Sequence, residues 1–261
     1  MTASGTSHRA HAHAAALAFQ RQTIELAADQ MRPITPGWVA RSQSLPMVWG
    51  LNHVRLTRPV TYAQALALAE EHLGDLPYRH LIVEHQPTAE RLEAPFLADG
   101  WKVDREVMMV LARAPDRELD TDIAFEADGD EVARLMTRWV SEGEQLSGDE
   151  LAQVVECTRR EARARRARQL GVANEDGVLV AMTKLYSDGR IAQVEDVYTT
   201  PGARGRGYAR AMIGRALELA RAARHELVFI VADDDGWPKE LYARLGFDPV
   251  GRMLGFHRDA R

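Results

Sequence analysis

The sequence predicts an α/β fold with a mixed, mostly antiparallel sheet flanked by helices, and it predicts that this unit is duplicated. Three observations indicate this fold class. Segments with apolar residues at helical spacing occur together with short β-branched or alternating runs. Glycine-containing turns separate three strand-like runs between residues 171 and 199. The end of the first half repeats the pattern that ends the second half.

Composition restricts the class of protein. The 261 residues suffice for two domains, and 46% hydrophobic with 27% charged residues is typical of globular proteins. No apolar run reaches the roughly 18 residues of a membrane span, and a net charge of −5 gives no overall attraction to nucleic acid. The single cysteine, Cys157, excludes an intramolecular disulfide. We therefore expect a cytoplasmic protein without membrane or nucleic-acid partners, and a homodimer is left open.

The second half, residues 122–261, has clear signals in chain order. Helices are predicted over 130–140 and 147–170, the latter with Ser147 and Glu150 as a capping box. Three antiparallel strands follow within 171–199, and then a helix carries an apolar face from Ala209 to Ala220. The half is completed by a buried strand at 226–232, a short helix at 236–247 and an extended segment at 248–258.

The first half is a fainter copy. Residues 1–14 are expected to form a disordered tail and residues 15–114 a domain of their own. Its predicted elements are a helix at 20–30, strands at 47–57 and 79–84, helices at 62–73 and 88–101, and an extended run at 102–112. Gly100-Trp101 corresponds to Gly246-Phe247, and the charged segment 112–122 is the expected linker. The alternative is two unrelated α/β halves.

Residues 199–212, TTPGARGRGYARAM, join a predicted strand to a predicted helix through glycines and arginines. A helix N-terminus presents unpaired backbone N–H groups and the positive end of the helix dipole. Gly205 and Gly207 would let this backbone approach a phosphate closely, and Arg204 and Arg206 would add positive charge. The segment therefore predicts a pyrophosphate site, although glycines also occur in such turns for geometry alone.

The segment VYTTPGARGRGYA resembles the acyl-CoA pyrophosphate loop of the GNAT (Gcn5-related N-acetyltransferase) superfamily, through Arg204, Gly207 and Ala209. The segment DGWPKELYARLGF resembles a later motif of the family through Leu241, Tyr242, Leu245, Gly246 and Phe247. It departs from that motif at Asp235 and Pro238, where asparagine and alanine are usual. The resemblance covers residues 122–261 and suggests a tandem GNAT with a degenerate N-terminal copy, in which TRPVTYA replaces the loop.

The resemblance implies acetyl-CoA as acyl donor and no metal. The residues it implies for binding acetyl-CoA are Val197, Tyr198, Thr199, Arg204, Gly205, Arg206, Gly207, Tyr208, Ala209 and Asp235. An alkyl ammonium has a pKa of about 10, so that a carboxylate must take a proton from the acceptor. Glu195 and Asp196 occupy adjacent strand positions that face opposite sides.

The family pattern favours Glu195 as this base, and a solvated acidic strand end is the alternative. Tyr242 would protonate the departing thiolate, or it would only pack beneath the cofactor. The N–H groups of Val197 and Thr199 would pair with the pantetheine arm, and that of Val197 with the thioester oxygen.

The expected function is an acyl-CoA-dependent N-acyltransferase that transfers acetyl to a primary amine of a small molecule or peptide by direct attack. The alternative is a non-catalytic acyl-CoA-binding sensor or scaffold. A nucleotide-binding enzyme is disfavoured because no Walker lysine follows the glycines. The arginine-rich segment 159–168 is expected to be a solvated helix face, and the alternative, which the resemblance implies, is guidance of an acidic substrate. The acidic run 233–235 is expected to cap a helix rather than bind a metal.

Overall fold

The computed structural model describes residues 3–143 and 146–259. The first half consists of α1 (Ala3–Ala27), β1 (Gln30–Ile34), β2 (Gly37–Arg41), η1 (Trp49–Leu51), β3 (His53–Leu56), α2 (Tyr62–Leu73), β4 (Tyr78–Val83), α3 (Gln86–Ala98) and β5 (Lys102–Leu111). The second half consists of β6 (Phe125–Glu126), α4 (Gly129–Gly143), α5 (Gly148–Ala164), β7 (Arg168–Ala173), β8 (Leu179–Ser187), β9 (Ile191–Thr199), η2 (Pro201–Ala203), α6 (Tyr208–Ala222), β10 (Leu227–Asp233), α7 (Pro238–Arg244) and β11 (Phe247–Asp259).

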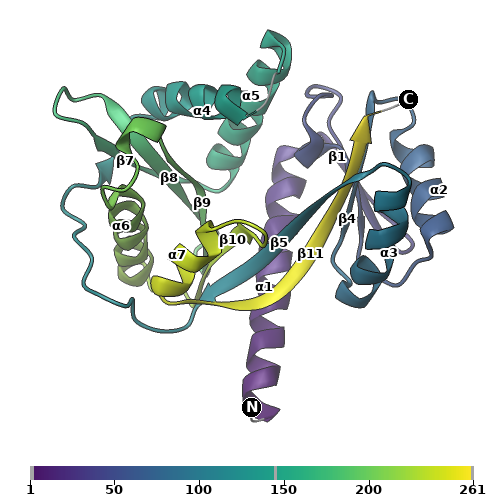
Figure 1. Ribbon diagram of the computed structural model, residues 1–261, viewed down its shortest axis with the longest axis horizontal. Helices are drawn as coiled ribbons and strands as arrows, with labels where there is room; N and C mark the ends of the chain where they lie inside the picture. The colour runs from purple at the N-terminus through teal and green to yellow at the C-terminus, as the bar shows by residue number, and fades with distance from the viewer. Residues whose placement is uncertain (1–2, 144–145, 260–261) are drawn as a thin grey trace.

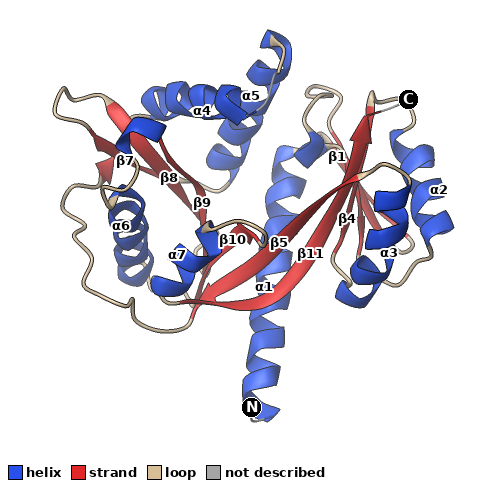
Figure 2. Ribbon diagram, viewed as in Figure 1, coloured by secondary structure: helices blue, strands red, loops and turns tan. Residues whose placement is uncertain are grey.

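All strands belong to one sheet. Across the described residues, eleven strands follow the order β1-β2-β3-β4-β11-β5-β10-β9-β8-β7-β6. In this described sheet the pairs β3–β4 and β9–β10 are parallel, and the other neighbouring pairs are antiparallel. Figure 2 shows helices on both sides of the strands. The predicted mixed, mostly antiparallel sheet flanked by helices is confirmed.

The two halves repeat one order of elements and exchange their last strands. The order β3-α2-β4-α3-β5 in the first half corresponds to β9-α6-β10-α7-β11 in the second. Strand β5 pairs with β10 and β11 of the second half, while β11 pairs with β4 and β5 of the first. Figure 1 shows these two long strands crossing side by side between the lobes. The predicted division into 15–114 and 122–261 therefore does not separate the sheet, because each half completes the other.

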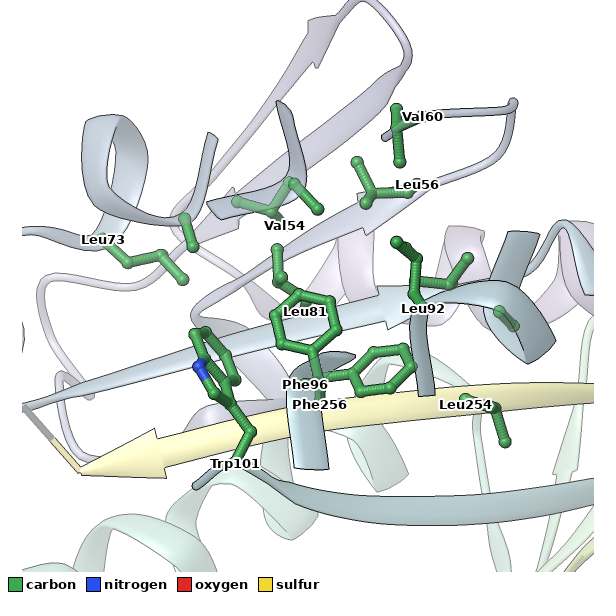
Figure 3. Close-up of a cluster of buried hydrophobic side chains, with 14 of the residues drawn as sticks. Val54, Leu56, Val60, Leu73, Leu81, Leu92, Phe96, Trp101, Leu254 and Phe256 are labelled. Atoms are coloured by element: carbon green, nitrogen blue, oxygen red, sulfur yellow. The ribbon is translucent and has the colours of Figure 1, made fainter. Parts of the chain in front are cut away.

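The exchange extends into the two hydrophobic cores. In the first-half core the ring of Phe256 from β11 stacks on Phe96 of α3, with ring centroids 4.5 Å apart (Figure 3). Leu254 of β11 packs in the same cluster. In return, Val107 and Met109 of β5 pack in the second-half core. Because a buried side chain of this size contributes about 1.5–3 kcal/mol on burial, the exchanged strands stabilise both halves.

Helix α1 begins at Ala3 where the sequence predicted a disordered tail over residues 1–14. One apolar side of α1 is buried against the middle of the sheet: Ala12, Ala16 and Phe19 are at most 4% exposed. The ring of Phe19 meets Phe229 of β10 edge-on at 5.5 Å. These contacts stabilise a helix whose sequence has only a weak amphipathic pattern. Of the described residues, no helix is both long and apolar enough to cross a membrane.

Three further differences from the sequence prediction are local. The hairpin β1–β2 was missed because its proline-containing segment lacks an alternating pattern. The helix predicted over 147–170 ends at Ala164, and Arg166 then adopts a left-handed backbone (φ 46°) before β7. Arg165 was expected on a solvated face but is 2% exposed. Its guanidinium donates to the Phe19 carbonyl at 2.6 Å and to Thr23 Oγ1 at 2.7 Å.

The capping box predicted at α5 is confirmed. Ser147 Oγ accepts from the Glu150 N–H at 3.2 Å, and a Glu150 carboxylate oxygen accepts from the Ser147 N–H at 2.7 Å. Gly246 lies directly after α7 with φ +98°, and a Cβ there would lie 2.2 Å from the Arg113 carbonyl oxygen. The capping box is readable from sequence because Ser147 and Glu150 are close along the chain, whereas the contact of Gly246 with Arg113 is not.

Candidate active site

The turn between β9 and α6 leaves a helix N-terminus open. Gly207 is the N-cap of α6 with φ 83°, and no side chain caps this helix. Gly205 also has a left-handed backbone, with φ 78°. A Cβ added to either glycine would meet no protein atom within 4 Å. The first N–H groups of α6 therefore border open space, which is the geometry predicted for phosphate binding.

A cavity of ≈620 Å³, here called the loop cavity, lies beside this N-terminus. The sequence-predicted residues that line it are Val197, Thr199, Arg204, Gly205, Gly207, Tyr208, Ala209 and Tyr242. The strand end, the glycine turn and α7 thus meet at one place. The sequence predicted this meeting from two motifs, at 197–209 and 235–247, that are separate in the chain.

The loop cavity has further lining residues that the sequence did not reveal. Trp237, 65% exposed, lies on its wall before α7. The linker contributes Asp116 and Arg117. Both Asp116 carboxylate oxygens accept from Arg210 of α6, at 2.8 and 3.0 Å, and the Asp116 N–H donates to the Arg244 carbonyl at 2.8 Å. The linker is held against α6 and α7, and no local pattern in the sequence signals that contact.

Strand β9 leaves its parallel neighbour half-way along. Pairing between β9 and β10 ends at Val194 opposite Ile230. On the other edge of β9 the register with β8 shifts between Met182 and Lys184, and Asp196 has a positive φ of 55°. This irregularity is a bulge, which re-aims the side chains that follow. As a result Val194 and Val197 pack in one core, while Glu195 faces the other side of the sheet.

Glu195 lines a second cavity of ≈280 Å³, here called the α1 cavity because α1 covers it. Gln193 Nε2 donates a short hydrogen bond to the Glu195 carboxylate. Burial raises the pKa of Glu195 well above its usual value; the charges of Asp196, Glu161 and Glu106 raise it further, and Lys184 opposes them. A carboxyl with a raised pKa is a stronger base once it has lost its proton.

The neighbouring acid, Asp196, already has a partner within the protein. Asp196 Oδ2 accepts from Lys184 Nζ at 2.6 Å, and these side chains are 14% and 3% exposed. Of the two candidate bases, Glu195 lines the α1 cavity, whereas Asp196 lines neither the loop cavity nor the α1 cavity and forms this ion pair. Neither residue belongs to a solvated strand end.

Tyr242 lies on the loop-cavity side of the sheet. The residue is 7% exposed and lines the loop cavity, and its ring meets Phe247 edge-on at 6.5 Å. Burial, and then the charge of Glu195, raises the pKa of Tyr242 above its ordinary value. The phenol therefore keeps its proton at neutral pH and is available as a hydrogen-bond donor.

Three predicted cofactor contacts are not brought to the loop cavity. Tyr198 points to the other face of the sheet, where its hydroxyl donates to Glu142 Oε2 at 2.5 Å and its ring stacks on Trp139. After the bulge, Val197 faces the loop-cavity side of the sheet. Tyr198 is its neighbour in the strand and therefore faces the other side. Arg206 is exposed and does not line the cavity. Asp235 accepts from Arg105 at 2.8 Å, a partner on the first-half strand β5 that the sequence could not indicate.

The acidic run 233–235 is used within the protein. Asp233 Oδ1 accepts from the Asp235 N–H at 2.9 Å, and Asp234 forms ion pairs with Lys239 and Arg252. Across residues 3–143 and 146–259, no group of three His, Cys, Asp or Glu side chains could hold a metal ion.

Comparison with known proteins matches residues 133–247 to the model of the acetyltransferase (GNAT) family. The matched region spans α4 to the start of β11 and contains the glycine turn, the bulge and Tyr242. The chain contains a GNAT acetyltransferase domain. No curated protein matches the chain.

Solved structures share the fold well beyond this GNAT domain. A functionally unknown conserved protein from Staphylococcus epidermidis has a TM-score of 0.69 at 14% identity, over 90% of this chain and 96% of that chain. A GCN5-related N-acetyltransferase from Kribbella flavida has a TM-score of 0.62 at 16% identity, over 96% of both chains. A tandem GNAT protein from the clavulanic acid biosynthesis pathway has a TM-score of 0.52 at 16% identity, over 92% of this chain and 93% of that chain. These matches show that the arrangement of both halves is a known fold.

The loop cavity of the GNAT domain fits an acyl-CoA. The open N-terminus of α6 and the side-chain-free space over Gly205 and Gly207 suit a pyrophosphate. Arg204, whose Nε donates to the Thr199 carbonyl at 3.1 Å, stands beside this space with a positive charge. Phosphate, cation and unpaired N–H groups are complementary in charge and in hydrogen bonding.

Proposed function

We propose that the protein is an acyl-CoA-dependent N-acyltransferase that transfers acetyl from acetyl-CoA to a primary amine by direct attack. The observation that carries the proposal is the place where β9 leaves β10. The loop cavity and Tyr242 lie on one side of the sheet at this point, and Glu195 lies on the other. A thioester and an amine that entered from opposite sides would meet there.

The roles of the side chains follow from this placement. Acetyl-CoA would supply the acyl group as a thioester, and transfer would form the amide C–N bond, break the C–S bond and release the thiol. Glu195 takes the proton of the acceptor ammonium. Tyr242 gives its phenolic proton to the departing thiolate and regains a proton from the amine nitrogen, which loses its second proton as the amide forms. The N–H groups of Val197 and Thr199 hold the pantetheine arm, because β9 has no β10 pairing at these residues.

The raised pKa of Glu195 gives the reaction a pH dependence of defined sign. The carboxyl must be ionised to accept a proton, so activity falls as pH falls through its folded-state pKa. Protonation of the acceptor amine also increases as pH falls, and it lowers the activity further. In Glu195→Gln the first of these effects is absent, and the activity is low at every pH.

A screen of amines with acetyl-CoA, read by release of free thiol, tests the proposal. We expect turnover with at least one amine. Tyr242→Phe should lower kcat by roughly 10²- to 10⁴-fold while the affinity for acetyl-CoA changes little, since only a hydroxyl is lost. The matched control is Tyr198→Phe, whose hydroxyl lies outside the loop cavity.

Acetyl-CoA binding without turnover of any amine would instead favour the acyl-CoA-binding sensor or scaffold. Normal turnover of Tyr242→Phe at all pH values would reassign this residue to packing.

A further inference from the structure

The α1 cavity is built by both halves of the protein. It lies between α1 and the sheet and is lined by carboxyl groups from three elements. These are Glu106 on β5, Glu161 on α5 and Glu195 on β9. Glu106 belongs to the first half, so the exchanged strand β5 brings one of these acids to the second half.

Carboxyl groups outnumber available cations in this cavity. Arg55, which also lines it, forms an ion pair with Glu84. Lys184, which lies near, is paired with Asp196 at 2.6 Å. Within the described part of the chain, none of the three cavity glutamates forms an ion pair. Three half-buried acids that face one cavity without an ion-pair partner are costly, unless a ligand supplies positive charge.

The pKa values agree with this excess of acid. Burial raises the pKa of Glu106, and burial together with Asp196 raises that of Glu161 to about 7. Each carboxyl would return toward its ordinary pKa if a cation lay beside it. The cavity is therefore prepared to bind positive charge rather than to repel it.

A second observation, independent of the acids, also indicates a ligand. Tyr186 is 2% exposed and lines the α1 cavity, yet its hydroxyl has no hydrogen-bond partner. Buried hydroxyl groups almost always have one. A ligand N–H in the cavity would donate to this oxygen, as an ammonium does.

The arrangement of the acids favours an organic cation over a metal ion. The described residues contain no three His, Cys, Asp or Glu side chains that converge on one ion. The negative charge is instead distributed over strands β5 and β9 and helix α5. An elongated organic cation with separated charges fits this distribution better than a compact one.

We propose that the acceptor is an aliphatic diamine or polyamine, whose reacting amine lies at Glu195 and whose second ammonium is bound by Glu106 and Glu161. This inference rests on the proposed N-acyltransferase function. Glu195 alone would serve a monoamine, and the two remaining acids have no role in that case. The first half would then contribute to substrate specificity through Glu106.

Kinetics with paired substrates test this inference. We compare 1,4-diaminobutane with n-butylamine at saturating acetyl-CoA, and expect a kcat/KM at least tenfold higher for the diamine. In Glu106→Gln this ratio should fall at least tenfold, because an amide of the same shape carries no charge. Glu25→Gln is the matched control, since Glu25 is exposed on the covering helix α1 and should leave the ratio unchanged. Thermal unfolding checks that both variants fold.

A binding measurement makes the test independent of turnover. Calorimetric titration of each amine into the full chain with CoA present should show at least tenfold tighter binding of 1,4-diaminobutane, and Glu106→Gln should abolish this preference. Equal binding of the two amines, or an unchanged preference in both Glu106→Gln and Glu161→Gln, overturns the inference. Selective diamine binding without acetylation of any amine supports the site and counts against the proposed function alone.

Discussion

The N-termini of α2 and α6 occupy equivalent places in the two halves, but the first is capped by side chains and the second is open. At α2, Thr61 Oγ1 accepts from the Gln64 N–H at 3.3 Å, and Gln64 Oε1 accepts from the Thr61 N–H at 2.9 Å. At α6, Gly207 has no side chain, and no side chain of the described residues caps the helix. The first helix has its own side chains as partners, whereas the second presents its N–H groups to a cavity.

The helices α3 and α7 differ in the same sense. Phe96 of α3 is fully buried between Phe256, Trp101 and Tyr62. Its counterpart region in α7 carries Tyr242, whose ring lines the loop cavity. The comparison teaches that the same order of elements can fill the end of α2 with a cap and the face of α3 with a buried ring, while the equivalent places at α6 and α7 border a cavity.

The largest expected effect comes from closing the open helix. Gly207→Val should weaken acetyl-CoA binding at least 100-fold, because a branched side chain would fill the space over the helix N-terminus and would be strained at φ 83°. Calorimetry on the folded variant measures this loss. Gly202→Val is the control, since a Cβ there also meets no atom within 4 Å but the residue does not line the loop cavity.

The same titration of the unmodified chain should give one acetyl-CoA site. Two sites of similar affinity would show that the capped helix α2 binds the ligand as well, and would remove the contrast between the halves. Unchanged affinity in Gly207→Val would remove the pyrophosphate assignment.

A smaller effect concerns pH, because the halves bury opposite kinds of titratable group. Burial lowers the pKa of His80 to about 4, aided by His257 and Arg55 and opposed by the Trp49 carbonyl and Asp104. In the unfolded chain His80 has a pKa of about 6.5 and binds a proton as pH falls below that value, whereas in the folded chain it stays neutral. Its contribution therefore lowers the free energy of unfolding by about 2 kcal/mol between pH 7 and pH 5. Denaturant unfolding of His80→Gln should show that much less acid sensitivity.

Glu161 should behave in the opposite way. Its folded-state pKa of about 7 lies above the value of about 4.5 expected in the unfolded chain, so its cost to folding decreases as pH falls through this window. Glu161→Gln should remove that gain. If His80→Gln retained the full loss of stability on acidification, His80 would not be the group responsible.

The smallest effect comes from uncapping α2. Thr61→Ala should lower the free energy of unfolding by about 1 kcal/mol, the usual value for an N-cap. Chemical denaturation measures it, and Ser147→Ala in the capping box of α5 gives a matched value from the second half. Acetyl-CoA affinity should not change in either variant, and a change with Thr61→Ala would connect α2 to ligand binding.

Much of the fold could be predicted because its signals are local. The Ser147–Glu150 capping box and the glycines at 205 and 207 each mark the start of a helix, and each signal lies within a few residues of that start. The strand exchange could not be predicted, since β5 and β11 carry ordinary strand patterns that do not specify their neighbours. The N-terminal part of helix α1 was missed, although a helix was predicted from residue 20, because Ala12 and Ala16 are buried only by distant parts of the sheet.

The candidate site divides along the same line. The motifs placed Gly207 and Tyr242 at one cavity, and strand alternation separated Glu195 from Asp196. The contact of Asp235 with Arg105 and the presence of Asp116 in the cavity wall depend on segments far apart in the chain. The second acid of the α1 cavity, Glu106, was equally hidden, because it lies in the half that the sequence treated as separate.

The position of β11 also determines when the protein can be completed during synthesis. Strand β11 contains residues 247–259, yet its place in the sheet is between β4 and β5, which the ribosome releases far earlier. Until it arrives, both of those strands have an unpaired edge, and the first-half core lacks Leu254 and Phe256. The first half therefore cannot complete its fold before the second half has been synthesised. A nascent chain stalled before β11 would expose open sheet edges to chaperones and to other unfinished chains, and the first half would be closed only when β11 arrives.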